Sequence, residues 1–163
     1  MLFPVSLPST GGDTQYVNMH LAYDELPQAT KRRLDGLKAI HVYQSHHSAR
    51  KLMELSPESR SRVPDAVAHP IVRTHPESGR KAIYINPIRT EGILGMPETE
   101  ALTLLADLLE HATQPQYQYR HQWRPDDLVM WDNRSLLHKA NGDYDMTQLR
   151  YLYRVMLQGN APV

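Results

Sequence analysis

Turn-forming residues cut this sequence into short β-prone runs, and this spacing constrains the fold more than any other feature. Strands are predicted over residues 2–7, 38–43, 71–74, 81–85, 117–123, 128–131, 135–138 and 150–157. Pro76 and Gly79 lie between two of these runs, in the positions that suit a hairpin turn. Many short strands with few helices indicate a mostly β fold, a barrel or sandwich with helical insertions.

Helices are predicted at four places between the strands. They cover residues 18–26, 27–36, part of 46–62, and 98–112. The last is the clearest, because its apolar residues recur at helical spacing, Pro97 opens it, and acidic residues occupy its first turn. Asn18 is placed to cap the first helix, and Gly36 is placed to end the second.

Composition excludes several classes of protein. The 163 residues carry 18 Lys and Arg against 18 Asp and Glu, so no net charge attracts nucleic acid. There is no Cys for a disulfide, a thiolate metal site or a Cys nucleophile. No run of about 18 apolar residues is present, and residues 1–8 make a poor secretory signal. We expect a single cytoplasmic domain over residues 1–163 that binds neither nucleic acid nor a membrane.

The last strand carries two arginines among apolar residues. Alternation places Arg150, Leu152 and Arg154 on one face, with the two arginine Cα atoms roughly 13 Å apart. If this face points inward, each guanidinium needs an anion, and a carboxylate or sulfonate matches its bidentate geometry. The alternative is an edge strand with both arginines in solvent, because Arg is rarely buried.

His138 and Thr14 are two further candidates. His138 ends a short predicted strand, where a neutral imidazole can bind a metal, although a lone His is more often structural. Thr14 closes a turn-rich loop, where its hydroxyl can bind a ligand carboxylate or simply cap the loop. The pairs His46–His47 and His75–Glu77 are assigned to the surface, since adjacent His side chains diverge and the second pair lies in the presumed hairpin tip.

Four segments together resemble one known family. They are residues 7–14 (LPSTGGDT), 69–76 (HPIVRTHP), 79–86 (GRKAIYIN) and 131–134 (WDNR), followed by His138 and the Arg150–Arg154 pair. In order and spacing these are similar to the taurine dioxygenase (TauD/TfdA) family. The resemblance implies a double-stranded β-helix, or jelly roll, that uses Fe(II) and 2-oxoglutarate to hydroxylate a C–H bond.

The resemblance also implies a role for each matching residue. His138 corresponds to one His of the iron triad of two His and one carboxylate. Arg150 corresponds to the Arg that holds the distal carboxylate of 2-oxoglutarate, and Thr14 to the Thr that hydrogen-bonds it. Arg154 corresponds to the Arg that binds the anionic group of the primary substrate. On this basis we expect Arg150 and Arg154 to face inward.

One family feature has no match in this sequence. The other two iron ligands of the family come from a His-x-Asp or His-x-Glu motif before the segment at residues 7–14, and only six residues precede that segment here. We therefore expect the C-terminal part of a jelly roll, lacking the N-terminal strands and two of the three iron ligands. Its sheet edges and apolar faces would be uncovered, which favours a homo-oligomer or a covering segment that is missing.

Three hypotheses follow from this partial match. The first is a truncated Fe(II)- and 2-oxoglutarate-dependent dioxygenase acting on a small anionic substrate. The second is an inactive fragment that serves as a carboxylate-binding or interaction module. The third is a misplaced start codon, with the missing motif encoded upstream.

Overall fold

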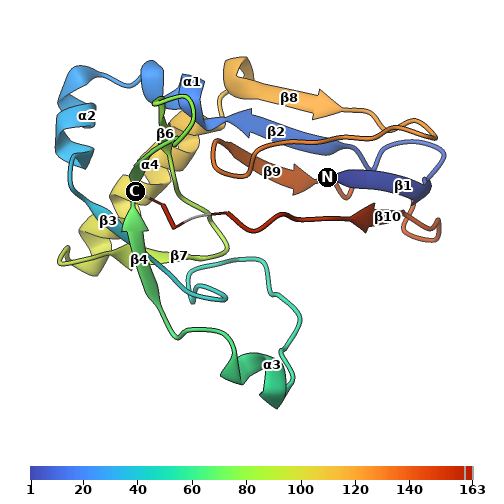
Figure 1. Ribbon diagram of the computed structural model, residues 1–163, viewed down its shortest axis with the longest axis horizontal. Coiled ribbons are helices and arrows are strands. Elements are labelled where there is room, and N and C mark those ends of the chain that lie inside the picture. Colours follow the sequence, from blue (N-terminus) through green and yellow to red (C-terminus); the bar gives the residue numbers. More distant parts are fainter. Residues whose placement is uncertain (160, 163) are drawn as a thin grey trace.

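The computed structural model describes residues 1–159 and 161–162, and its strands form four small antiparallel sheets. In one, β2 (Thr14–Asn18) lies between β8 (Gln118–His121) and β9 (Leu136–Ala140). In a second, β1 (Leu2–Ser6) pairs with β10 (Tyr151–Arg154), so the two ends of the chain meet. These two sheets extend side by side away from the helices (Figure 1). They carry most of the candidate residues.

The other two sheets lie near the helical end of the molecule. One has the order β4 (Val67–Pro70), β3 (Lys38–His41), β7 (Thr90–Ile93). The other is the hairpin of β5 (Val72–Thr74) and β6 (Lys81–Ile83), as the turn residues between them predict. The mostly β fold is therefore confirmed, whereas closure into a jelly roll stays a prediction.

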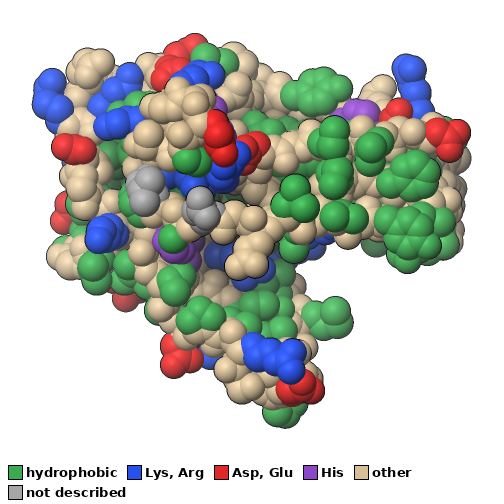
Figure 2. All heavy atoms as spheres, in the orientation of Figure 1, with side chains coloured by type: hydrophobic (Ala, Val, Ile, Leu, Met, Phe, Trp, Pro, Cys, Tyr) green, Lys and Arg blue, Asp and Glu red, His purple; other side chains and the backbone are tan. Residues whose placement is uncertain are grey.

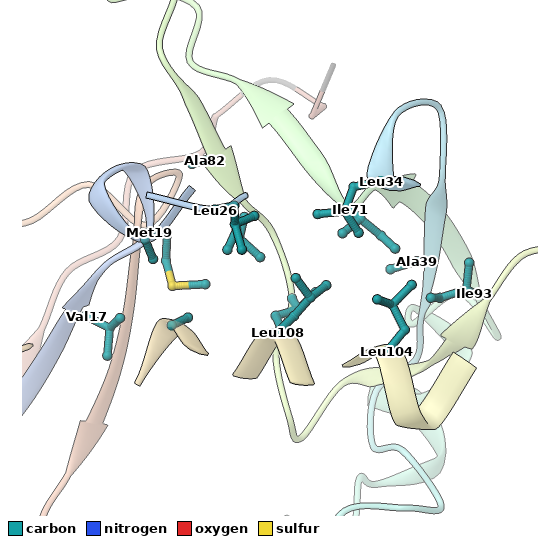
Figure 3. Packing of buried hydrophobic residues seen from close by; sticks show 14 of the residues in the cluster. Val17, Met19, Leu26, Leu34, Ala39, Ile71, Ala82, Ile93, Leu104 and Leu108 are labelled. Carbon is teal, nitrogen blue, oxygen red and sulfur yellow. The ribbon is translucent and has the colours of Figure 1, made fainter. Parts of the chain in front are cut away.

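Most of the helices contribute buried residues to the core, whereas the short helix at Pro57–Ser61 contributes none. They are α1 (Met19–Asp24), α2 (Gln28–Leu34), α3 (Pro57–Ser61), α4 (Glu98–Ala112) and a 3-10 turn (Pro115–Tyr117). Leu104 and Leu108 of α4 belong to the same buried cluster as Met19, Leu34 and Ile71 (Figure 3). This core lies beside β2, and α1 follows β2 directly, so core packing fixes the strand that carries Thr14.

Local signals located the helices well. Asn18 caps α1, since its Oδ1 accepts a hydrogen bond from the amide of Leu21 at 3.0 Å. The predicted bounds of α4 match the structure, and Gly36 has a φ of +73° just after α2. Of residues 46–62 only α3 is helical, a short turn capped by Ser56.

Two parts of the strand prediction were wrong. Residues 128–131 form no strand; Val129 only exchanges two backbone hydrogen bonds with Leu2, because turns flank it on both sides. The strands β2, β4 and β7 were missed. Segment 14–18 reads as a loop and helix cap, yet it pairs on both edges with strands more than 100 residues away, a contact that local patterns cannot show.

The sheet of β1 and β10 leaves one apolar face open. Phe3, Val5, Tyr151 and Tyr153 are all exposed, and apolar side chains gather over this arm in Figure 2. Phe3 lies opposite Tyr153 in the register, so these side chains form one patch. The uncovered apolar surface agrees with the expectation from sequence, while oligomerisation stays a prediction.

Candidate functional site

Thr14 and Arg150 lie in direct contact although 136 residues separate them. Arg150, just before β10, donates from Nε to the carbonyl oxygen of Gly12 at 2.6 Å and from Nη2 to the hydroxyl oxygen of Thr14 at 3.3 Å. Trp123 also donates to that oxygen from its indole nitrogen, at 3.0 Å. Thr14 is only 2% exposed, so the pair is anchored on its buried side. The geometry thus brings the two residues together, while their role in binding 2-oxoglutarate stays a prediction.

Tyr16 connects this pair to His138. It follows Thr14 on the same face of β2 and lies opposite His138 in the register of β9. The two rings are 6.1 Å apart, and the ring of Trp131 is 4.9 Å from that of His138. Burial raises the pKa of Tyr16 to about 12, although the charge of Arg150 opposes the shift. The hydroxyl is buried without a hydrogen-bond partner among the described residues.

His138 has the protonation state that a metal ligand needs. Burial lowers the pKa of its imidazole, and the positive charge of Arg154 lowers it further. The ring is therefore neutral at physiological pH, and a neutral ring offers a nitrogen lone pair to a cation. β9 continues for two residues beyond His138, so the residue lies within the strand rather than at its end, where the sequence pattern predicted it.

A cleft of about 240 Å³ opens beside His138. Its walls come from α1, β3, β6, β9, β10, the loop after β6 and the loop before β9. The lining residues are Met19, His41, Ile83, Tyr84, Ile85, Asn86, Arg89, Asn133, Arg134, Leu136, Leu137, His138 and Arg154. They include three arginines and no carboxylate, so the cleft favours an anion. Asp132 and Glu77 pair with Arg134, which leaves Arg89 and Arg154 as the less neutralised charges.

Arg150 and Arg154, which the sequence places on one strand face, have different surroundings in the structure. Arg150 is half-buried and turns toward the loop at Gly12, whereas Arg154 is exposed and lines the cleft with His138. The expectation that both face an apolar interior was therefore wrong for Arg154. Its strand pairs with β1 alone, so nothing in the described residues covers its outer end.

The assignment of His75 to the surface was also wrong. Its side chain is only 12% exposed, and its Nε2 lies 3.0 Å from Oδ2 of Asp132. Arg134 donates to both oxygens of the same carboxylate and to Glu77. The Arg134 guanidinium holds the pKa of Asp132 well below its usual range, and the bond from His75 adds to the effect. This network fixes the turn that leads into β9; by contrast, the side chain of His46 is exposed, as expected.

His41 is a cleft residue that the sequence prediction missed. The segment was identified as a strand, but a single His in it gave no sign of which face lines the cleft. Burial lowers the pKa of His41 to about 4, with the nearby His69 and Arg89 contributing, so the ring is neutral. Its Nε2 is buried and has no hydrogen-bond partner among the described residues.

The described residues do not complete an iron site. Across residues 1–159 and 161–162, no three His, Cys, Asp or Glu side chains converge in a way that could hold a metal ion. Fe(II) oxygenases of this kind use two His and one carboxylate, and this geometry offers His138 alone. His75 and Glu77 do not supply the others, since both are committed to the Asp132–Arg134 network.

Known proteins match this chain over most of its length. The model of the family "Taurine catabolism dioxygenase TauD, TfdA family" matches residues 1–156. An alpha-ketoglutarate-dependent 2,4-dichlorophenoxyacetate dioxygenase of Burkholderia sp. (strain RASC) is 44% identical over 159 residues, which is 98% of this chain and 52% of that protein. An alkylsulfatase of Acinetobacter baylyi is 32% identical over 95% of this chain and 50% of its own length.

Solved structures of related proteins have a similar fold. A putative alpha-ketoglutarate-dependent 2,4-D dioxygenase from Burkholderia xenovorans superposes with a TM-score of 0.84 at 38% identity, over 93% of this chain and 58% of that one. AAD-2 in complex with Mn(II) and N-oxalylglycine reaches 0.86 at 35% identity, over 99% of this chain and 63% of that one.

The fold and the matches therefore place this chain among the relatives of alpha-ketoglutarate-dependent dioxygenases. More specifically, the chain belongs to the TauD/TfdA family, whose members depend on Fe(II) and 2-oxoglutarate. The chain spans about half the length of the curated relatives it matches. None of the helices in the described residues is long and apolar enough to cross a membrane.

Proposed function

We propose that this chain provides the 2-oxoglutarate and substrate sites of an Fe(II)-dependent dioxygenase that hydroxylates a small anionic substrate. One observation carries the proposal: Arg150 is fixed on Gly12 and Thr14, two residues of the family-like segment at 7–14. Its Nη1 makes no hydrogen bond with the described residues, so it can meet a carboxylate of 2-oxoglutarate, with the Thr14 hydroxyl beside it. The jelly-roll closure and the activity of the whole protein belong to this proposal.

The charge of the cleft supports an anionic primary substrate. Arg154 and Arg89 line it without a carboxylate among the lining residues. Relatives are named for 2,4-dichlorophenoxyacetate, (S)-phenoxypropionate and alkyl sulfates, all of them small anions. Arg154 is the residue we assign to the carboxylate or sulfate of the substrate, and His138 to iron. Bound iron would supply the oxidising chemistry, and His138 would offer it one neutral nitrogen ligand.

Calorimetry with 2-oxoglutarate and with N-oxalylglycine tests the proposal directly. The unmodified chain is expected to bind both, and Arg150→Ala is expected to abolish binding. Arg32→Ala is the matched control, because Arg32 is exposed on α2, away from the site. Equal affinity in Arg150→Ala and the unmodified protein would refute the assignment of Arg150.

Activity separates an enzyme from a carboxylate-binding module. Anaerobic addition of Fe(II) and 2-oxoglutarate, followed by air, is expected to release succinate only if iron is held. Binding of 2-oxoglutarate without succinate would favour the binding module. In that case His138→Ala would leave 2-oxoglutarate affinity unchanged, since the hydrogen bonds that hold Arg150 and Thr14 do not involve His138.

A further inference from the structure

Both backbone groups of Gly12 are committed to side chains from distant parts of the chain. Its carbonyl oxygen accepts the hydrogen bond from Nε of Arg150 at 2.6 Å. Its amide donates to Oδ1 of Asp143 at 3.1 Å. Asp143 lies in the loop between β9 and β10, and Arg150 ends that loop. Gly12 therefore connects the side chain of Asp143 to the guanidinium of Arg150.

Arg120 extends this chain of contacts to the sheet. It projects from β8, and its Nη2 pairs with Oδ2 of Asp143. Its Nε donates to Oδ2 of Asp13 at 2.6 Å, and Asp13 is only 5% exposed. The carbonyl of Asp13 in turn accepts from the amide of Asn141 at 2.9 Å. Arg120 therefore ties the segment before β2 and the loop after β9 to the same strand.

The backbone at Gly11 and Gly12 packs tightly against its neighbours. Gly11 and Gly12 both have positive φ, 73° and 69°, which residues with a Cβ adopt at a cost. A Cβ on Gly11 would lie 2.5 Å from the carbonyl oxygen of Asp143, and one on Gly12 would lie 3.1 Å from Cδ of Arg150. The backbone thus approaches Asp143 closely at Gly11 and Arg150 closely at Gly12, and the Gly12 amide is hydrogen-bonded to Asp143 as well.

We propose that Asp143 and Arg120 are positioning residues, which hold Gly12 so that the guanidinium of Arg150 faces its ligand carboxylate. This inference rests on the proposed role of Arg150 in 2-oxoglutarate binding. Among the described residues Asp143 makes no hydrogen bond or ion pair with Arg150, and it does not line the cleft beside His138, so we expect its effect to pass through Gly12. The Arg120 guanidinium and the Gly12 amide hold the pKa of Asp143 below its usual range, so the carboxylate stays charged at neutral pH.

Calorimetry on Asp143 variants tests this chain of contacts. Affinity for N-oxalylglycine per folded protein is expected to fall about tenfold in Asp143→Ala and less in Asp143→Asn, which keeps an acceptor for the Gly12 amide. Asp145→Asn is the matched control. Asp145 lies in the same loop, but its side chain bonds only to Thr147 and Gln148 among the described residues. Arg150→Ala supplies the reference for complete loss.

A second readout does not depend on the ligand. NMR can follow hydrogen exchange at Nε of Arg150, which is protected by its bond to Gly12. Exchange is expected to quicken in Asp143→Ala and in Arg120→Gln, and to stay unchanged in Asp145→Asn. A purely structural role would lower the melting temperature and leave both the exchange rate and the affinity of the folded fraction unchanged.

The outcomes distinguish the two proposals. If Asp143→Ala binds as the unmodified protein does while Arg150→Ala does not bind, the positioning role is overturned and the proposed function stands. If the unmodified protein binds neither 2-oxoglutarate nor N-oxalylglycine, the proposed function fails, and the role of Asp143 in ligand binding fails with it.

Discussion

Arg150 reaches across the molecule to the carbonyl oxygen of Gly12, with 2.6 Å between Nε and that oxygen. A residue near the end of the chain is thereby held by a residue near its beginning, and the same guanidinium also donates to Thr14. Because two of its nitrogens are fixed by the protein, the direction of the remaining Nη1 is set before a ligand arrives. Preorganisation of this kind strengthens binding, since less conformational entropy is lost.

Lysine at position 150 is expected to bind 2-oxoglutarate poorly despite its charge. An ammonium group is a compact donor without the fork of a guanidinium, so it cannot satisfy Gly12, Thr14 and a carboxylate in the same geometry. We expect Arg150→Lys to weaken binding by tenfold or more, about 1.5–3 kcal/mol for a lost charged hydrogen bond. Calorimetry measures this, with Arg32→Lys as the control. Unchanged affinity would show that charge alone suffices.

Three alanine substitutions of glycine are expected to differ in their cost to stability. Gly11→Ala meets both a positive φ and a backbone oxygen at 2.5 Å, so we expect it to lower the free energy of unfolding by about 2 kcal/mol or more. Gly79→Ala has a φ of +68° in open space, which costs about 1 kcal/mol. Gly142 has neither a positive φ nor a neighbouring atom within 4 Å of an added Cβ. The free energy of unfolding of Gly142→Ala should therefore lie within about 0.5 kcal/mol of that of the unmodified protein. Urea denaturation ranks them; an equal cost at Gly11 and Gly142 would contradict the observed packing.

The carboxylate of Asp132 is expected to stabilise the fold at neutral pH. Its pKa is lowered in the folded state, first by Arg134, so its contribution is present above about pH 4 and is lost as the pH falls further. Asp132→Ala removes the carboxylate that Arg134 and His75 share and leaves Glu77 as their remaining carboxylate partner. The substitution is expected to cost about 2–3 kcal/mol at pH 7, a figure reduced by partial exposure. Asp107→Ala, at an exposed site on α4, is the control. A cost for Asp132→Ala that does not shrink between pH 7 and pH 3 would contradict this account.

His41 is expected to make the protein less stable in acid over a higher pH range than Asp132 does. The pKa of His41 is about 4 when folded and about 6.5 when unfolded, so the unfolded chain takes up the proton first. The stabilisation is full above pH 6.5 and is lost as the pH falls toward 4, by at most about 3 kcal/mol before allowing for solvent screening. His41→Phe should remove this part of the pH dependence of thermal unfolding. His46→Phe should retain it, and equal profiles for the unmodified protein and His41→Phe would rule out His41 as the source.

Local chemistry in the sequence determined the elements whose signals are contained in a few neighbouring residues. α4 was predicted from its periodic apolar face and Pro97, α1 from the cap at Asn18, and the hairpin from Pro76 and Gly79, because each depends on contacts within one or two turns of chain. The order of the residues in segment 7–14 and in the last strand likewise marked Thr14, Arg150 and Arg154 as candidates. None of these signals depends on how distant segments pack.

The tertiary structure decided which candidates meet. Strand β2 forms through pairing with β8 and β9, more than 100 residues away, so no local pattern predicts it. The same pairing places Tyr16 opposite His138. Other contacts between distant segments bury His75 against Asp132 and bring Asp143 to the amide of Gly12. The folded chain also gives Arg150 and Arg154 different surroundings, because what covers each side chain depends on segments that are distant in the sequence.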